Sequence, residues 1–505
     1  MEGRAGSAFR AALLALSLLI PAPTDGPGEG LDDLETKLRS PDKWTRTEAV
    51  EELARRRSPA AWALVIQALA DPKGEVADTA QLVLAALDDE KTLERLAKRE
   101  GLGAKEPLVR ARVAELLGRS RLDPPAKLLI EALSDSDPEV RRMGAWSIER
   151  LGAAGRLGDE AREKLAAELA RRARSERDAL ARGRELFAWT ALDRGGARAG
   201  VEAAQREREP LVRGAAAALL PRVLEVGAAV EALASLAADP VASVRTVAAE
   251  SLGEIGTRSA AAVLVQRLAE EQEERLLLRH VERLQALSGL KHRRDVRPWN
   301  DWLRALPEDW RGRSTVAADA PGPGENGSVT LDGLPILSRR VAILIDLSGS
   351  IWNIRPDGRT RKEIVDGKLR EALESFTPDT RFNLIPYTGK PFPWKEELVR
   401  ATPANVRAAA GWFEDLHETG SGNFWDAALL ALADPEVDTL VVLFDGEPTG
   451  GIRHRFELIV PLFLERNAAR RVTVDILLVD ASKHLQRIWG ELAAGTGGRL
   501  VAVQL

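Results

Sequence analysis

The 505-residue chain contains no cysteine. Disulfides, iron–sulfur clusters, cysteine-ligated zinc, thiol catalysis and a lipid-anchored lipoprotein cysteine are therefore excluded. Neither sign of charge prevails, because 72 Lys and Arg are set against 77 Asp and Glu, for a net charge of −5. A general nucleic-acid binder is normally basic, so nucleic acid is not an expected partner. Packing must stabilise the fold, and this length predicts two or three units.

Long apolar runs are also scarce. The clearest one is AALLALSLLI (11–20), which follows Arg4 and Arg10 and ends at PAPT (21–24). This pattern predicts a secretory signal peptide over 1–24, with a disordered or packed N-terminal helix as the alternative. The run is short for a membrane anchor, and no later segment is apolar enough to cross a bilayer. We therefore expect a secreted or periplasmic, cell-envelope protein with no transmembrane segment after the signal peptide.

One helical pattern recurs through the first half of the chain. VRRMGAWSIERL (140–151) and VRTVAAESLGEI (244–255) place small or apolar residues at the same offsets, which form one face of a helix. Each follows a short turn that contains Asp-Pro. The corresponding prolines are separated by 31, 35, 31, 72 and 30 residues, and the long step has room for one degenerate copy around 160–193: Pro41, Pro72, Pro107, Pro138, Pro210 and Pro240. The period predicts an all-α helical solenoid over 31–310.

These units resemble HEAT repeats in their Asp-Pro, Val-Arg, Ala and Leu-Gly pattern. The resemblance implies that the repeat arginines join neighbouring repeats by pairing with acidic turn residues such as Asp137 or Asp239. The arginines at that position are Arg110, Arg141, Arg213 and Arg245. An anion-binding role for them is the alternative.

The composition changes after residue 310. Residues 311–335 are rich in Pro, Gly and small polar residues and predict a linker. Apolar runs then alternate with helical patterns through 336–505, which predicts an α/β domain with a doubly wound, mostly parallel sheet. Two of the buried strands, VAILID (341–346) and TLVVLFD (439–445), end in an aspartate. Ligands of such sheets bind at the carboxyl ends of the strands, so Asp346 and Asp445 are candidate site residues.

Asp346-Leu347-Ser348-Gly349-Ser350 is the DxSxS motif, and residues 336–505 resemble a von Willebrand factor A (VWA) domain, which is Rossmann-like. FDGEPTGG (444–451) resembles the second acidic loop of that family. The whole layout resembles bacterial exported proteins with HEAT-like repeats followed by a VWA domain. The resemblance implies a metal-ion-dependent adhesion site, at which the bound metal engages an acidic group of a partner.

The residues themselves suit a hard cation. Mg²⁺ takes about six oxygen ligands, and alternate residues of a tight loop can turn their oxygens towards one point. Ser348 and Ser350 offer hydroxyls, while Asp346 and Asp445 bring two negative charges. We therefore expect Mg²⁺, or Mn²⁺ or Ca²⁺ in its place. The alternative is that Asp346 only caps the following segment and that the serines satisfy loop amides.

The third loop departs from the family. There the threonine of Gly-Gly-Thr touches the metal, whereas ETGSGNFWDAALLAL (418–432) aligns Gly422 with that threonine. Ser421 is the candidate replacement ligand if the loop shifts by one residue. Otherwise water fills the position and the site is weakened.

No catalytic constellation is evident. The five histidines lack metal spacing such as HExxH, and neither a Ser-His-Asp set nor a GxxxxGK[ST] loop is present. We therefore expect an exported binding or adhesion protein, not an enzyme, whose protein partner presents an acidic residue. One alternative is a structural scaffold with a degenerate, metal-independent VWA site. Another is a hydrolase or lyase on the HEAT surface, since bilin lyases carry such repeats.

Overall fold

The computed structural model describes residues 30–98, 100–312 and 329–504. Segment 1–24, predicted as a signal peptide, lies outside the described residues. The chain divides into two compact units, of which one ends at Val223 and the other begins at Leu224. Among the described residues, no helix is long and apolar enough to cross a membrane.

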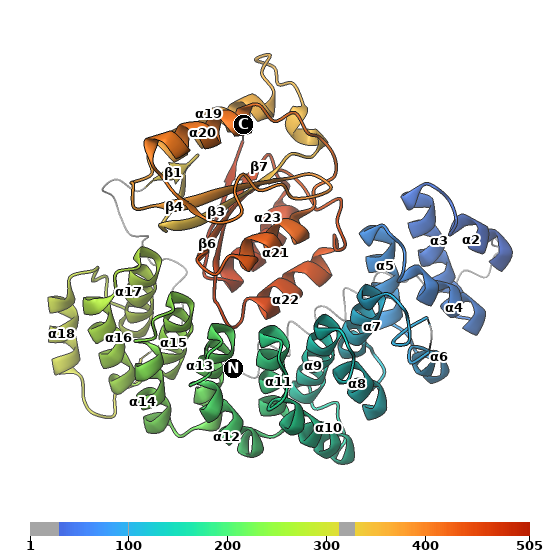
Figure 1. The fold of residues 1–505 in the computed structure, drawn as a ribbon, viewed down its shortest axis with the longest axis horizontal. Coiled ribbons are helices and arrows are strands. Elements are labelled where there is room, and N and C mark those ends of the chain that lie inside the picture. Colours follow the sequence, from blue (N-terminus) through green and yellow to red (C-terminus); the bar gives the residue numbers. More distant parts are fainter. Residues whose placement is uncertain (1–29, 99, 313–328, 505) are drawn as a thin grey trace. The chain divides into compact units, whose positions relative to one another are not determined.

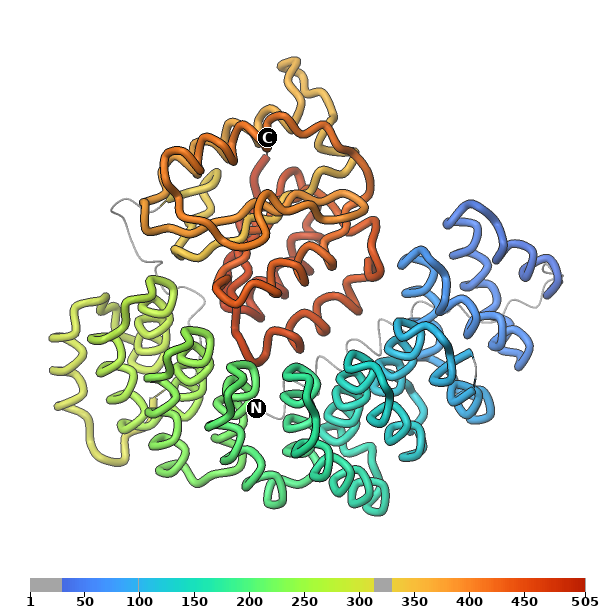
Figure 2. The backbone as a smooth tube through the Cα atoms, in the orientation of Figure 1, coloured from blue at the N-terminus to red at the C-terminus, as the bar shows by residue number. Residues whose placement is uncertain are grey.

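The first unit consists of helical hairpins in two layers (Figures 1 and 2). In one layer α3, α5, α7, α9, α11 and α13 contact one another in succession, and in the other α8 contacts α10, which contacts α12. This two-layer stacking is the predicted helical solenoid. Its helices are α2 (Leu31–Lys37), α3 (Lys43–Arg56), α4 (Pro59–Ala68), α5 (Gly74–Ala85), α6 (Glu90–Arg95), α7 (Pro107–Arg119), α8 (Ala126–Leu133), α9 (Pro138–Ala153), α10 (Asp159–Arg172), α11 (Ala179–Leu192), α12 (Arg194–Ala204) and α13 (Pro210–Val223).

Small residues allow the helices of one layer to approach closely. A Cβ atom at Gly118 of α7 would lie 2.6 Å from the backbone of Ser147 of α9. The Ser147 hydroxyl accepts a hydrogen bond from the backbone N–H of Gly118 at 2.9 Å. The Leu-Gly position of the repeat is therefore fixed by packing between helices.

The repeat arginines join neighbouring repeats by pairing with acidic residues of the turns, as predicted, although Asp137 is not one of these partners. Arg110 pairs with both carboxylate oxygens of Asp135, at 2.7 and 2.9 Å. Asp137, expected as such a partner, instead accepts hydrogen bonds from the first backbone N–H groups of α9. Arg245 pairs in the same way with Glu271. The partners lie in the turns that begin the next repeat, because the guanidinium projects towards the following hairpin.

Arg141 forms an equivalent ion pair with Glu176. Its guanidinium donates to both oxygens of Glu176, at 2.6 and 2.7 Å, and to the carbonyl of Ser136. Burial favours the protonated form of Glu176, but Arg141 and other donors overcome it and hold the pKa of that carboxyl at about 2. The ion pair therefore stabilises the fold at pH values above the ordinary glutamate pKa. This stabilisation is lost as the pH falls towards 2.

Replacing Arg141 with methionine is expected to lower the free energy of unfolding of the first unit by about 2 kcal/mol at pH 7, because Glu176 keeps Arg172 as a partner at 2.9 Å. Urea unfolding of the full chain measures the change. Arg171→Met is the control, since this side chain is 63% exposed in its pair with Glu168. An equal loss of unfolding free energy in both variants would contradict a stabilising role for the Arg141–Glu176 pair.

The second unit begins with the remaining helical repeats. In these, α15 contacts α14, α16 and α17, while α16 contacts α18. Residues 310–312 pair with the turn at 256–258 through backbone hydrogen bonds, so the start of the segment expected to be a linker is bound to the helices. The helices are α14 (Val226–Leu236), α15 (Ala242–Ile255), α16 (Arg258–Glu270), α17 (Glu274–Ser288) and α18 (Val296–Ala305).

An α/β domain follows, built on a six-stranded sheet in the order β5-β4-β3-β6-β7-β8. Every strand pair is parallel except β4–β5, so the predicted doubly wound sheet is confirmed. The strands are β3 (Arg340–Asp346), β4 (Arg381–Tyr387), β5 (Val399–Arg400), β6 (Thr439–Phe444), β7 (Thr473–Val479) and β8 (Leu500–Val503). A short hairpin precedes them, formed by β1 (Thr330–Leu331) and β2 (Leu334–Pro335). The helices and one 3-10 turn are η1 (Gly349–Trp352), α19 (Arg361–Glu374), α20 (Pro403–Glu414), α21 (Phe424–Ala433), α22 (Phe456–Arg466) and α23 (Lys483–Gly495).

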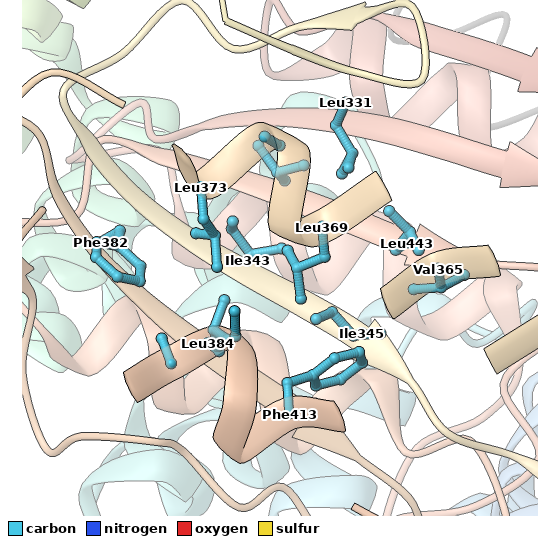
Figure 3. Packing of buried hydrophobic residues seen from close by; sticks show 14 of the residues in the cluster. Leu331, Ile343, Ile345, Val365, Leu369, Leu373, Phe382, Leu384, Phe413 and Leu443 are labelled. Atoms are coloured by element: carbon cyan, nitrogen blue, oxygen red, sulfur yellow. The ribbon is translucent and has the colours of Figure 1, made fainter. Parts of the chain in front are cut away.

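Helices cover both faces of this sheet, as Figure 1 shows. On one face, Ile343 and Ile345 of β3 lie against Leu369 of α19 and Phe413 of α20 (Figure 3). On the other, Trp489 of α23 packs against an aromatic cluster from α21, β6 and α22. Burial on both faces accounts for the continuous apolar runs of the strands.

The α/β domain is bound to α17 through two buried arginines. Arg275 donates to the Thr473 hydroxyl at 3.0 Å and to the carbonyl of Gly497 at 2.9 Å. Arg279 donates to the same hydroxyl at 2.8 Å and to the carbonyl of Thr496 at 2.5 Å. Gly497 has φ of +70°, and a Cβ there would lie 1.9 Å from the Arg279 guanidinium. Since Thr473 begins β7, this contact lies at the amino edge of the sheet.

Candidate metal-binding site

The candidate site lies at the opposite, carboxyl edge of the sheet, where the two central strands end side by side. Strands β3 and β6 are parallel neighbours, and Ile345 is in register with Leu443. Asp346 is the last residue of β3, and Asp445 directly follows β6. The fold therefore brings the two predicted carboxylates to adjacent strand ends.

Asp346 is a buried carboxylate, only 8% exposed. It accepts a hydrogen bond from the backbone N–H of Ser348 at 2.7 Å. Burial raises the pKa of this carboxyl to about 7, the Ser348 hydrogen bonds oppose the rise, and the charge of Asp445 adds to it. In the described part of the chain no basic side chain pairs with Asp346. Its charge therefore lacks the compensation that a buried carboxylate ordinarily has.

The two serines connect this carboxylate to Asp445. The hydroxyls of Ser348 and Ser350 are 3.3 Å apart, and the Ser350 hydroxyl donates to Oδ1 of Asp445 at 2.7 Å. The turn η1 produces this arrangement, because it bends the chain immediately after β3. Four of the five predicted site residues are thus brought together, and their oxygens form one cluster.

The third loop contributes backbone rather than a hydroxyl. Gly420 pairs with the DxSxS loop, since its carbonyl accepts a hydrogen bond from Gly349 at 3.3 Å. A Cβ atom at Gly422 would lie 2.5 Å from Oδ2 of Asp346. Gly422 therefore occupies the position opposite Asp346 that the family alignment assigns to threonine, and on this backbone a side chain there would displace the carboxylate.

Ser421, the fifth predicted ligand, lies against two glycines of neighbouring loops. Its hydroxyl lies so close to Gly450 that a Cβ there would be 2.3 Å away, and it also faces Gly389 at 3.6 Å by the same measure. The backbone N–H of Gly422 donates to the Thr449 hydroxyl at 2.8 Å, and the N–H of Thr449 donates to the carbonyl of Gly422. These bonds fix the third loop against the loop that follows Asp445. The Ser421 hydroxyl lies beside Gly450 of that loop and Gly389 of the loop that follows β4.

Arg361 is a residue of the site that sequence reasoning missed. It is the first residue of α19 and donates to Oδ2 of Asp445 at 3.0 Å and to Asp480 at 2.8 Å. Arg361, Asp346 and Asp445 line the same small cavity. A cation at a helix N-terminus is unfavourable to the helix dipole, so an arginine there was a signal of acidic neighbours.

The donor set fits a hard divalent cation. It contains two carboxylates and two hydroxyls, one carboxylate being buried without a cation. Among the residues that the structure describes, no three His, Asp or Glu side chains form a cluster suited to metal binding. Hydroxyl ligands would therefore have to complete the set, as the DxSxS spacing implies.

The fold defines the class of protein: a HEAT-like helical solenoid followed by a VWA domain. Residues 199–285 match the family model for HEAT repeats. Mouse inter alpha-trypsin inhibitor, heavy chain 4, is 31% identical over 132 residues, which are 24% of this chain and 13% of the relative. Bovine inter-alpha-trypsin inhibitor heavy chain H3 is 31% identical over 131 residues, 24% of this chain and 14% of the relative. The chain thus spans a minor part of these VWA-containing relatives.

Solved structures resemble each part separately. The SpRpn10 VWA domain is 17% identical, with a TM-score of 0.26, and the match covers 32% of this chain and 87% of that one. The CpcE–CpcF complex of phycocyanin lyase from Nostoc sp. PCC7120 is 21% identical, with a TM-score of 0.28, and covers 57% and 98%.

Proposed function

We propose that this chain is an exported protein-binding scaffold whose VWA domain holds a divalent cation and engages an acidic group of a protein partner. The HEAT repeats and the VWA-containing relatives support a protein-interaction role. The observation that carries the metal site is the convergence of Asp346, Ser348, Ser350 and Asp445 at the ends of β3 and β6.

Within the proposal, these four side chains hold Mg²⁺, or Mn²⁺ or Ca²⁺, and the cation supplies a positive centre for a carboxylate of the partner. Asp346 is held in place by the Ser348 backbone, and Ser350 orients Oδ1 of Asp445. Gly422 offers no hydroxyl, so within the proposal water completes the coordination. The function is binding, and no reaction is required. Secretion or a cell-envelope location belongs to the same proposal.

A metal-independent scaffold is the second candidate. Two observations favour it: Gly422 offers no hydroxyl, and Arg361 already pairs with Asp445 at 3.0 Å. In that case partner binding would be insensitive to EDTA.

The experiment compares wild type with Asp346→Asn, which preserves size and removes charge. Calorimetric titration of the full chain with MgCl₂ or MnCl₂ is expected to give a saturable signal that the variant loses. At a metal concentration of 100 times Kd, wild type should gain about 2.7 kcal/mol of stability.

Asp415→Asn is the matched control, because Asp415 is exposed at the end of α20. The control should respond as wild type does. An identical metal response in wild type and Asp346→Asn would refute the site. No response in wild type, with partner binding unaffected by EDTA, would leave the metal-independent scaffold.

A further inference from the structure

The candidate site contains a cation of its own. The side chain of Arg361 is about one-fifth exposed and lies between two carboxylates. Nη1 donates to Oδ2 of Asp445 at 3.0 Å, and Nη2 donates to Oδ2 of Asp480 at 2.8 Å. The capping of α19 by Thr360 and Glu363 fixes the backbone from which Arg361 projects.

Asp445 is consequently shared between two donors. Its Oδ1 accepts from Ser350, on the side of the DxSxS loop, and its Oδ2 accepts from Arg361. Asp346, by contrast, has only the Ser348 donors and no basic partner in the described chain. The positive charge of the site is therefore entirely on the Asp445 side.

We propose that Arg361 is a built-in counter-ion that stabilises the metal-free site and lowers its affinity for divalent cations. The inference rests on the metal site proposed above. A divalent cation bound to Asp445 would be repelled by a guanidinium on the same carboxylate. Without a metal, the guanidinium neutralises a carboxylate that otherwise faces the charge of Asp346. Arg361 thus sets the cation concentration at which the site becomes competent for its partner.

A purely orienting role predicts the opposite result. If Arg361 mattered only because it aims Asp445 at the loop, its removal would disorder a ligand and weaken metal binding. If it acts as a counter-ion, its removal frees Asp445 and strengthens metal binding, while the metal-free protein becomes less stable. The two effects of opposite sign separate a counter-ion from a structural support.

The test uses Arg361→Gln in the full chain, with MnCl₂ as the probe in calorimetric titrations. We expect Mn²⁺ to bind about tenfold more tightly than in wild type, from repulsion between partly exposed charges. Thermal unfolding in EDTA should show a lower midpoint for the variant. Arg355→Gln is the matched control, because Arg355 also pairs with Asp480, at 3.3 Å, from the loop that precedes α19. It should bind Mn²⁺ as wild type does.

Each outcome has a distinct meaning. Equal or weaker Mn²⁺ binding by Arg361→Gln, with wild type binding normally, overturns the counter-ion role and leaves the metal site intact. If neither wild type nor Arg361→Gln binds Mn²⁺, the metal site itself is refuted. Binding by Arg361→Gln alone supports the counter-ion and means that the guanidinium masks the site in wild type.

Discussion

Replacing Glu250 with glutamine is expected to lower the free energy of unfolding of the second unit by about 3–5 kcal/mol. Glu250 lies on α15, where Arg283 contacts it at 2.7 Å and Arg279 at 3.5 Å. Burial would raise the pKa of this carboxyl, but the arginines, with Arg471, hold it below its ordinary value. Glu250 therefore remains charged and compensates the arginines around it.

The loss is large because Arg279 is already in an unfavourable environment. Burial and the neighbouring charge of Arg275 lower the pKa of its guanidinium to about 10, although Glu250 acts against this. Glutamine keeps the shape of Glu250 and removes the charge, so Arg279 would remain buried beside Arg275 with less compensation. Arg279 also donates to Thr473 at the start of β7 and to the carbonyl of Thr496 at the end of α23, so the loss should extend to the contact with the α/β domain.

Urea unfolding of the full chain, with hydrogen exchange of α15 and α17, measures this effect. The matched control is Glu254→Gln, one turn further along the same helix at an exposed position. A second variant tests the cause: Arg279→Met should recover part of the stability in the Glu250→Gln background, because it removes the uncompensated charge. If Glu250→Gln and Glu254→Gln lower the free energy of unfolding equally, the charge of Glu250 does not stabilise the unit.

The part of the candidate site that lies at strand ends could be predicted from the sequence. Asp346 and Asp445 each end an apolar run, and parallel strands bring their carboxyl ends to one edge. The spacing of Ser348 and Ser350 then places both hydroxyls in the same loop. The length of each apolar run and the alternation of strands with helices are local signals, so no tertiary information was needed.

Contacts between distant segments could not be predicted in this way. The orientation of Ser421 depends on the close approach of Gly450, and the position of Gly422 depends on where the third loop meets Asp346. Arg361 reaches Asp445 across 84 residues of sequence. In each case the chain offers several polar neighbours, and only the packing of loops selects among them.

The repeat arginines show the same limit on a smaller scale. The period predicted that Arg110 would reach an acidic turn, and it does. Asp135 and Asp137 lie in that one turn, and pattern alone does not decide which of them faces the guanidinium. The proline after Asp137 makes it the cap of α9, which leaves Asp135 for the arginine.

His280, beside Arg279 on α17, is expected to make the second unit sensitive to acid. The ring is 1% exposed, and neither nitrogen has a hydrogen-bond partner within the described chain. Burial lowers its pKa to about 4, with Glu271 opposing the shift and Arg267 adding to it. Because the folded pKa is below the ordinary value of 6.5, protonation favours the unfolded state. The penalty begins as the pH falls through 6.5 and is complete below 4.

The expected loss of stability from this group, relative to pH 8, is about 2 kcal/mol at pH 5 and about 3 kcal/mol at pH 4. His280→Leu should abolish that part of the pH dependence, and it should cost little at pH 8 because it removes two unsatisfied nitrogens. Urea unfolding of both proteins from pH 8 to pH 4 gives the difference, which cancels the other titrating groups. His484→Leu, at an exposed position of α23, should retain the acid sensitivity of wild type. If the free energy of unfolding depends on pH in the same way in wild type and His280→Leu, protonation of the buried ring does not destabilise the fold.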